Sequence, residues 1–299
     1  MMRLLLAAGV CALLLAQGCA STSPDSSEPP ISESQPTADH ADGPQGALFI
    51  IGGGARPDSL MQRFLDAADP DRAPYIAVLT MSSSERDTSY YYSATQFERL
   101  GGHPIHFNLT LADVVNKPVL DSLKNAAAIY MTGGDQSRFM EVVRDNPIAE
   151  AIHHAYQHGA VVGGTSAGAA VMSEIMITGD QHFSEEYQRT YDKVWKDNGI
   201  YASGLGMLDW AVVDQHFVAR SRYNRLFSAL ADHPGKWGVG IDEATALLVR
   251  GGRAEVCGES QVVVLRPPTS TQQQFRNIGL SGVQTDLLLA GQTFTIPAP

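Results

Sequence analysis

Residues 160–172 read AVVGGTSAGAAVM, a short apolar run that meets a glycine-flanked serine and then small residues. Apolar runs of this length are typical of buried strands, and small residues after a tight turn are compatible with a helix. Residues 164–168 fit the pattern G-x-S-x-G, whose strained turn exposes the serine Oγ and leaves the next backbone N–H free to face an oxyanion. The stretch therefore predicts a strand, a sharp turn and a helix, with Ser166 as a nucleophile at the turn.

Upstream of this stretch, short apolar segments alternate with amphipathic ones. Strands are expected at 47–51, 75–80, 105–107 and 126–131, and helices at 57–68, 88–100, 119–125, 137–144 and 148–158. Because parallel strands need crossover connections, this alternation predicts an α/β fold with a parallel, doubly wound sheet. Ligand groups in such sheets gather at the carboxyl ends of the strands. We therefore expect Gly52–Gly54, Gly133–Gln136 and Ser166 to share one edge of the sheet.

The pattern becomes more mixed downstream of Ser166. Residues 180–208 are polar, rich in aromatic residues and weakly periodic, and we expect them to pass over the edge that carries Ser166. Further strands are expected at 211–217, 237–241, 245–249, 254–257 and 262–265, with a helix at 220–231. From Pro267 the composition turns polar and rich in glutamine, and residues 285–296 are either a final strand pair or a loose tail.

The N-terminus has the features of an export signal. Met1-Met2-Arg3 precedes the apolar run 4–16, which is shorter than the roughly 20 residues that span a bilayer. Residues 15–19 read LAQGC, and small residues directly before a cysteine resemble the cleavage and acylation site of bacterial lipoproteins. We expect residues 1–18 to be a signal peptide and Cys19 to be lipidated, with ordinary secretion as the alternative. The protein is then an exported lipoprotein of the bacterial cell envelope, anchored by its lipid at the periplasmic face or the outer membrane.

Composition separates a tether from a folded part. Residues 20–44 contain six serines, five prolines and five acidic residues without lysine or arginine, so they cannot bury enough apolar surface to fold. We expect residues 19–45 to be a disordered acidic tether. Residues 46–299 are expected to form a single catalytic domain with a polar C-terminal extension, since 44% hydrophobic residues suffice for a substantial core.

Charge and cysteine content exclude two classes of interaction. The net charge of −11 and the lack of a polybasic stripe argue against a nucleic-acid partner. Cys257 is the one cysteine of the expected folded part, so no intrachain disulfide is expected there, and a small buried strand residue is its expected role.

A nucleophilic serine needs a base, and the base needs an orienting acid. His216 follows an expected strand within the polar run Asp214-Gln215-His216 and is the preferred base, although a histidine there also fits a structural hydrogen bond. Glu243 follows the strand 237–241 and is the preferred acid, with Asp180 as its competitor and a capping role as its alternative. The α/β-hydrolase fold places its acid before its histidine, whereas these residues run serine, histidine, acid, so a plain esterase is disfavoured.

Glycines and histidines elsewhere allow other interpretations. Oxyanion donors are expected from the backbone N–H of Ala167 and from Gly134-Asp135, although a glycine pair also fits a simple tight turn. Gly52–Gly54 lacks the further spaced glycine of a dinucleotide site, so nucleotide binding is disfavoured. Three histidines lie on one expected helix without a metal-binding motif, and a solvated helix face is the preferred interpretation: His153, His154 and His158.

Three arginines follow His216 on the expected helix: Arg220, Arg222 and Arg225. Arg222 and Arg225 are close in angle on a helix, so both guanidinium groups are placed to bind a carboxylate in bidentate fashion. Solvated surface is the ordinary alternative for charged helix residues. Beside a catalytic histidine, the arginines indicate an acidic group on the substrate.

Four blocks of the chain, in this order, resemble cyanophycinase, in the serine peptidase group that also holds the aspartyl dipeptidases. They are GGDQ at 133–136, GTSAGA at 164–169, DQHF at 214–217 with the three arginines and Leu226, and GIDEATA at 240–246. The similarity covers residues 46–265. It implies a class I glutamine-amidotransferase-like fold, which is a three-layer α/β sandwich with a largely parallel central sheet.

The resemblance also implies roles for the site residues. Ser166 is implied as the nucleophile, His216 as its base and Glu243 as the orienting acid. Five residues match positions that line the family's pocket for β-Asp-Arg units: Gln136, Asp214, Arg220, Arg222 and Arg225. No metal or organic cofactor is implied, and the family is commonly dimeric, so a homodimer is expected.

The function expected on this basis is hydrolysis of β-aspartyl bonds in cyanophycin by an exported serine exopeptidase, which releases β-Asp-Arg dipeptides. Two alternatives remain, an isoaspartyl or aspartyl dipeptidase acting on short peptides and a lipoprotein that binds peptides without hydrolysing them. Residues 181–204 form a longer segment than the family pattern has, and the N-terminal segments and the C-terminal extension lie outside it. The long segment is expected to overhang the pocket. Substrate choice is therefore the property that this departure from the family pattern affects most.

Overall fold

The computed structural model describes residues 43–297, apart from Pro70, Glu185 and Tyr187. The expected signal peptide, the lipidated Cys19 and all but the last residues of the expected tether lie outside this part of the chain. The described residues from 43 onward belong to one compact unit. Among them, no helix is long and apolar enough to cross a membrane.

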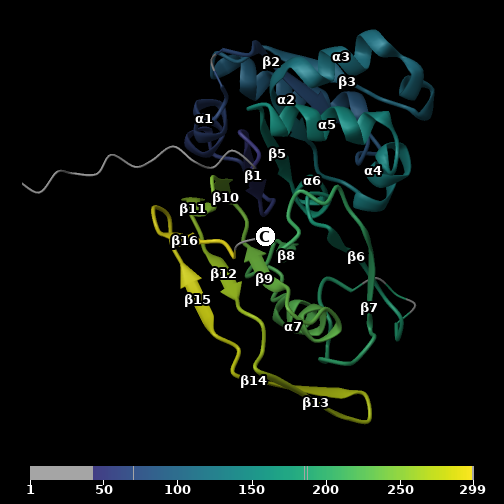
Figure 1. The fold of residues 1–299 in the computed structure, drawn as a ribbon, viewed down its shortest axis with the longest axis vertical. Coiled ribbons are helices and arrows are strands. Elements are labelled where there is room, and N and C mark those ends of the chain that lie inside the picture. Colours follow the sequence, from purple (N-terminus) through teal and green to yellow (C-terminus); the bar gives the residue numbers. More distant parts are fainter. Residues whose placement is uncertain (1–42, 70, 185, 187, 298–299) are drawn as a thin grey trace, which may run out of the picture. The chain divides into compact units, whose positions relative to one another are not determined.

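A sheet of eight strands forms the centre of this unit (Figure 1). Its five parallel strands are, in spatial order, β1 (Ala47–Ile51), β5 (Val161–Thr165), β4 (Ala126–Met131), β2 (Ala73–Leu79) and β3 (Pro104–Phe107). Beyond β1 the sheet continues through antiparallel strands β10 (Thr245–Arg250), β11 (Arg253–Gly258) and β16 (Thr293–Thr295). The expected fold class, α/β with a largely parallel central sheet, is confirmed.

Helices cover both faces of this sheet. Side chains alternate between the two faces along each strand, so both faces present apolar side chains against which helices pack. Phe49 and Tyr130 pack on one face against helices α1 (Asp58–Asp66) and α2 (Arg86–Arg99). Ile50 and Ile129 pack on the other against α3 (Lys117–Asn125), α4 (Gln136–Val143) and α5 (Pro147–Gln157). This arrangement makes the expected three layers. A short 3-10 helix, η1 (Leu111–Val115), joins β3 to α3.

A second sheet holds strands that the sequence analysis did not separate from the first. Its order is β15 (Thr285–Leu288), β12 (Val262–Leu265), β9 (Trp237–Ile241) and β8 (Ala211–Gln215). Strands β8 and β9 are parallel, as expected for a crossover through helix α7 (Tyr223–Asp232), and the other two are antiparallel. Its Val213 and Val264 belong to the same buried cluster as Leu247 of the central sheet, so the two sheets share a core.

Two hairpins complete the fold. Strands β6 (Ile175–Gln181) and β7 (Gly199–Ser203) pair with each other, so the weakly periodic segment 180–208 contains a strand for which no separate expectation was made. Strands β13 (Ser270–Gln274) and β14 (Asn277–Ser281) form the second hairpin, which extends away from the sheets (Figure 1). Residues 285–296 form two strands, β15 and β16, as one of the two expectations had it, and not a loose tail, but these strands do not pair with each other. Each of them completes the edge of a different sheet.

Candidate active site

Ser166 lies at the turn between β5 and the short helix α6 (Ala167–Ala170), with φ of 53° and ψ of −110°. A positive φ in a residue other than glycine is strained, as the elbow geometry requires. The flanking glycines are needed for close approach. A Cβ on Gly164 would lie 2.3 Å from the Gly168 carbonyl oxygen, and one on Gly168 would lie 2.2 Å from that of Met131. The glycines of the motif therefore let the turn pack against its own helix and against β4.

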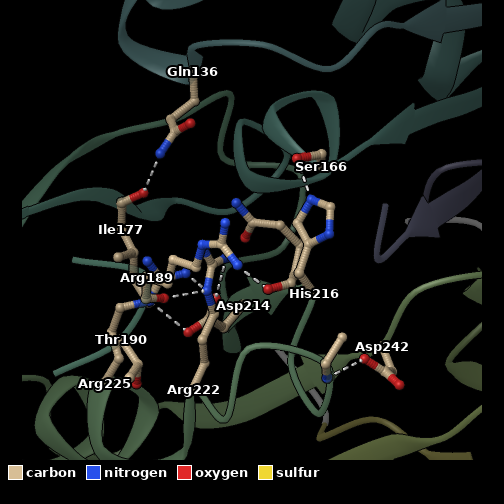
Figure 2. A network of polar contacts seen from close by, with 12 residues as sticks. Gln136, Ser166, Ile177, Arg189, Thr190, Asp214, His216, Arg222, Arg225 and Asp242 are labelled. Atoms are coloured by element: carbon tan, nitrogen blue, oxygen red, sulfur yellow. Dashed lines mark hydrogen bonds and ion pairs between the residues drawn. The ribbon is translucent and has the colours of Figure 1, made fainter. Parts of the chain in front are cut away.

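The expected catalytic side chains are brought together. The Ser166 Oγ lies 2.8 Å from His216 Nε2 (Figure 2), and His216 Nδ1 lies 2.6 Å from Glu243 Oε1. The His216 side chain is 9% exposed and that of Glu243 is 40% exposed. In this geometry Glu243 holds Nδ1–H, which leaves Nε2 to accept the serine proton. Asp180, the competing acid, is exposed and does not have this contact.

The catalytic residues come from both sheets, and the chain that follows β1 joins them. The N–H of Ser166 donates to the Ile51 carbonyl at 3.1 Å, and the N–H of His216 donates to that of Gly52 at 2.6 Å. The N–H of Ala244, next to Glu243, donates to the Gly53 carbonyl at 3.0 Å. The expectation that the glycine run lies beside Ser166 is therefore confirmed, although the histidine and the acid follow strands of the second sheet.

Gly53 and Gly54 have a function that the sequence analysis did not recognise. Both have a positive φ, 103° and 68°. A Cβ on Gly53 would lie 2.3 Å from His216 Cε1, and one on Gly54 would lie 2.7 Å from Glu243 Oε2. The glycine run thus forms the seat on which the histidine and glutamate rest. The sequence signal is three consecutive glycines after a buried strand, which predicts their place at the edge with Ser166 but not their contact with the histidine and the glutamate.

Asp242 is a second residue whose function was missed. Its Oδ1 accepts a hydrogen bond from the N–H of Ala219 at 2.8 Å (Figure 2), and its Oδ2 accepts one from Ser260 Oγ at 2.6 Å. His216 itself has a positive φ of 51°, so the turn that follows it is strained and needs such support. We conclude that Asp242 fixes the turn after His216, while its neighbour Glu243 contacts the imidazole.

The expected oxyanion donors differ in whether their backbone N–H group already has an acceptor within the protein. Ala167 is the first residue of α6, so its N–H has no acceptor within the helix and faces the same turn as the Ser166 Oγ. Gly134 has φ of 142°, and Gly133 approaches the Ser166 side chain. The N–H of Asp135, in contrast, donates to the Ser82 carbonyl at 2.9 Å, and its side chain caps α4. Asp135 is therefore already bonded within the protein, which leaves Ala167 and Gly134 as the expected donors.

The expected substrate-binding residues Asp214, Arg222 and Arg225 bind one another (Figure 2). Asp214 is fully buried and accepts a bidentate interaction from Arg225, with Nε to Oδ2 at 2.7 Å. Arg222 lies 3.4 Å from Asp214 and donates to the Gln215 carbonyl at 2.7 Å. Both arginines are only 2% exposed. Bidentate carboxylate binding is therefore seen for Arg225 and not for Arg222, and the carboxylate is that of Asp214 in the chain itself.

The two other residues expected to contact the substrate, Arg220 and Gln136, lie in surroundings that differ from each other. Helix α7 begins at Tyr223, so Arg220 precedes it and lies partly exposed in the turn after His216. The Gln136 side chain is 8% exposed and its amide donates to the carbonyl of Ile177 at 3.0 Å (Figure 2). Gln136 thus anchors strand β6, whereas Arg220 remains the arginine of the expected set that faces outward.

The electrostatic surroundings keep the histidine ready to act as a base. Burial lowers the pKa of His216 from its ordinary value, the hydrogen bond that its Nδ1–H donates to Glu243 raises it, and the charges of Arg220 and Arg222 lower it. The resulting pKa lies below that of a free imidazole. His216 is therefore neutral at neutral pH, which is the form that accepts a proton from Ser166.

A pocket of about 350 Å³ opens beside Ser166 and His216. Gly54, Gly133, Thr165, Arg56 and Tyr92 line it together with the catalytic residues. Pockets of this size hold small ligands with a few placed polar groups. The site therefore contains a nucleophile with its base and acid, backbone donors for an oxyanion, and space for one small acyl group.

Comparisons with known proteins agree with this geometry. A sequence model described as "Peptidase family S51" matches residues 48–257. The chain is 32% identical over 241 residues to a cyanophycinase of Nostoc sp., covering 78% of each chain. It is 33% identical over 227 residues to one of Geminocystis herdmanii, covering 73% of this chain and 80% of that one. The solved structure of a peptidase from an acI-B1 Actinobacterium superposes with a TM-score of 0.63 at 22% identity, over 85% of this chain and 98% of that one, which shows a shared fold.

The seat formed by Gly53 can be tested with a matched pair of variants. Gly53→Ala places a Cβ against His216 and is expected to lower kcat by about 100-fold or more, because a shift of about 1 Å at a catalytic group costs that much. Gly101→Ala is the control, since Gly101 also has a positive φ, 86°, but nothing lies within 4 Å of an added Cβ. Equal losses of activity in the two variants, compared at equal thermal stability, would contradict a specific role for Gly53.

The pH dependence of hydrolysis tests the electrostatics of His216. Activity is expected to persist below the ordinary pKa of histidine and to fall as His216 becomes protonated. Arg220→Gln removes a positive charge that disfavours the imidazolium, so the acidic limb of kcat/KM should move to higher pH. Arg99→Gln, which removes an exposed arginine paired with Asp58, serves as the control. If the acidic limb stays in place or moves to lower pH in Arg220→Gln, the charge of Arg220 does not lower the pKa of His216.

Proposed function

The chain belongs to peptidase family S51 and is a serine peptidase of the cyanophycinase type, and from this premise we propose that it hydrolyses aspartyl bonds in the backbone of cyanophycin and releases dipeptides in which the β-Asp-Arg bond stays intact. The single observation that carries the proposal is the contact chain from Ser166 through His216 to Glu243 beside a small pocket. The names of the relatives supply the substrate class. Arg56 and Arg220 near the site add positive charge suited to an acidic substrate.

The mechanism uses the geometry in two steps. Ser166 Oγ attacks the scissile carbonyl while His216 Nε2 takes its proton, and the N–H groups of Ala167 and Gly134 bind the oxyanion. His216 then protonates the leaving amine, so that an ester to Ser166 and a free amine result. A water molecule, deprotonated by His216, attacks the ester and regenerates the serine. Glu243 accepts the hydrogen bond from His216 Nδ1 and stabilises the imidazolium.

Cleavage of the natural polymer tests the proposal. Full-chain protein and its Ser166→Ala variant are incubated with insoluble cyanophycin, and the soluble products are identified by mass spectrometry. We expect β-Asp-Arg from the parent, and a loss of about 10³-fold or more from Ser166→Ala, because the nucleophile is gone while the binding groups remain.

The other outcomes of this experiment are also informative. Cleavage of short β-aspartyl peptides without any attack on the polymer would identify an isoaspartyl or aspartyl dipeptidase. If the parent and Ser166→Ala behave alike, Ser166 is not the nucleophile. A serine-reactive fluorophosphonate that fails to label Ser166 in the folded parent would instead favour a lipoprotein that binds peptides without hydrolysing them.

We also propose that the enzyme is exported and anchored at the cell envelope through Cys19. The charged start, the short apolar run and the small residues before Cys19 support this proposal. A polymer substrate would then be met outside the cytoplasm.

Lipidation can be measured directly. Full-chain protein expressed in a bacterium with a fatty-acid probe should be labelled and found in the membrane fraction, because several acyl chains anchor a protein firmly. Cys19→Ala should remove both the label and the membrane association, whereas Cys11→Ala, in the expected signal peptide, should retain both. Label that persists in Cys19→Ala would exclude this residue as the anchor.

A further inference from the structure

Arg56 and Tyr92 line the pocket beside Ser166, and the reaction mechanism gives neither of them a role. Arg56 follows the glycine run, and its Nη1 donates to the Tyr130 hydroxyl at 2.6 Å. Its backbone carbonyl accepts a hydrogen bond at 2.7 Å from Gln96, which belongs to α2. The guanidinium of Arg56 is therefore held in a defined place in the pocket of the nucleophile.

The charge of Arg56 has no counter-ion in the part of the chain that the structure describes. An exposed arginine such as Arg99 binds a carboxylate, that of Asp58. The hydrogen-bond partners of Arg56 are instead the neutral hydroxyl groups of Tyr130 and Ser93, and both contacts use Nη1. A guanidinium has five N–H donors in a planar fork that matches a carboxylate. The donors on Nε and Nη2 are thus available for a carboxylate from outside the chain.

Tyr92 presents an aromatic ring to the same pocket. The residue is 65% exposed although it lines the pocket, so its ring is open to a ligand. Its neighbour Tyr91 is 64% exposed and packs against it in a T-shaped arrangement, with 5.7 Å between the ring centroids, but does not line the pocket. Aromatic faces bind guanidinium groups by cation–π interaction and stacking. Tyr92 is therefore suited to bind a guanidinium group of a ligand.

The remaining walls of the pocket admit a ligand with both charges. Apart from Arg56 and the neutral His216, the described lining residues are uncharged, and several carry hydroxyl groups: Ser89, Tyr92, Ser93, Thr132 and Thr165. Residues 89, 92 and 93 share one face of α2, because residues three and four apart are neighbours on a helix. A carboxylate in this pocket meets Arg56, and a guanidinium meets an aromatic ring and hydroxyl oxygens.

We propose that this pocket binds the arginine of a β-Asp-Arg unit, with Arg56 on its α-carboxylate and Tyr92 on its guanidinium. The inference rests on the proposed function. Within the polymer both carboxyl groups of each aspartate are bound in amides, whereas each arginine keeps a free α-carboxylate and a guanidinium. The arginine thus has the two charges that the pocket residues match. Arg222 and Arg225 are bound to the buried Asp214 and do not line this pocket.

A purely structural role for Arg56 predicts a different pattern of defects. If Arg56 only braces its loop against Tyr130, its loss slows the hydrolysis of every substrate alike. Recognition instead makes the variant insensitive to whether the arginine of the substrate has its carboxylate. Substrates that differ in one charge of this arginine therefore separate the two roles.

The test substrate is a soluble dimer of two β-Asp-Arg units, joined by one backbone aspartyl bond. One series replaces an arginine by argininamide, which lacks the carboxylate charge, and another replaces it by citrulline, which lacks the guanidinium charge. Each replacement is made either in the unit that supplies the scissile carbonyl or in the unit that leaves, because both units contain an arginine. The value of kcat/KM is measured for each substrate with the full-chain protein.

The parent protein should lose about 10- to 100-fold in kcat/KM with argininamide in one of the two units, the usual value of a charge-assisted hydrogen bond. Citrulline in the same unit should cost about 2- to 30-fold, the range of a cation–π interaction. Arg56→Gln should remove the loss caused by argininamide. Tyr92→Leu should remove the loss caused by citrulline, whereas Tyr92→Phe keeps the ring and should retain it.

Two control variants match these changes. Arg253→Gln removes an arginine that also donates to a hydroxyl group, that of Thr293, but does not line the pocket. Tyr91→Leu removes the neighbouring exposed ring. Both controls should show the same losses as the parent with argininamide and citrulline. Thermal unfolding and labelling by a fluorophosphonate check that each variant is folded and has a reactive Ser166.

Other outcomes would overturn the proposal. If argininamide costs as much in Arg56→Gln as in the parent, or costs the parent nothing, Arg56 does not bind the carboxylate. If argininamide and citrulline act in different units, the two residues do not bind one arginine.

A dimer that the parent does not cleave calls for a binding measurement. Titration of β-Asp-Arg into Ser166→Ala, with and without Arg56→Gln, then decides the present inference. Binding weakened by about tenfold supports it, and equal or absent binding overturns it. A parent that cleaves neither the dimer nor the polymer contradicts the proposed function, whatever the result of this titration.

Discussion

Three backbone hydrogen bonds at the end of β1 hold the two sheets in catalytic register. The carbonyls of Ile51, Gly52 and Gly53 accept from the N–H groups of Ser166, His216 and Ala244 in turn. These donors follow three different strands, so one short segment sets the relative position of nucleophile, base and acid. The absence of side chains on Gly53 and Gly54 is a condition of this contact, because a methyl group there would occupy the space of the imidazole or of the carboxylate. The three acceptors are backbone carbonyls, which every residue type has, so the side-chain requirement of this arrangement lies at its glycines.

Arginines near the site divide into two groups by what they bind. Arg222 and Arg225 surround the buried Asp214, two residues before His216, and Arg222 also donates to the carbonyl of Arg189 at 2.9 Å. This buried cluster fixes the end of β8 and fastens the segment 182–198 to it. A buried charge without a partner is costly, so each member depends on the others. Arg222 also acts on the imidazole, since its charge and that of Arg220 both lower the pKa of His216. Arg56 lines the pocket and lies outside this cluster. The positive field at the site therefore comes from residues inside and outside the buried cluster.

Local sequence patterns are sufficient to predict much of the fold and the catalytic residues. The strands at 47–51, 126–131, 237–241 and 262–265 begin and end as predicted, because apolar runs closed by glycine or polar residues mark buried strands clearly. Ser166, His216 and Glu243 each follow a strand, and their contact agrees with that placement. The separation into two sheets was not predictable, since strand pairing depends on contacts between distant segments. The burial of Arg222 and Arg225 was missed for a similar reason, because only the three-dimensional register reveals Asp214 between them. No local sequence pattern marks Arg56 as a pocket residue, apart from its place after the glycine run.

The pairing of β1 bears on the order in which the catalytic residues can come together. β1 lies at the centre of the main sheet, yet its neighbour β10 is about 200 residues away in the sequence, and Leu48 pairs with Val249. β15 and β16 close the free edges of β12 and β11. Contacts of such long sequence separation form slowly and expose unpaired edges until they do. The site therefore depends on the slowest class of contact in the fold, because Glu243 reaches His216 only when the strands around it have paired with segments far away in the sequence.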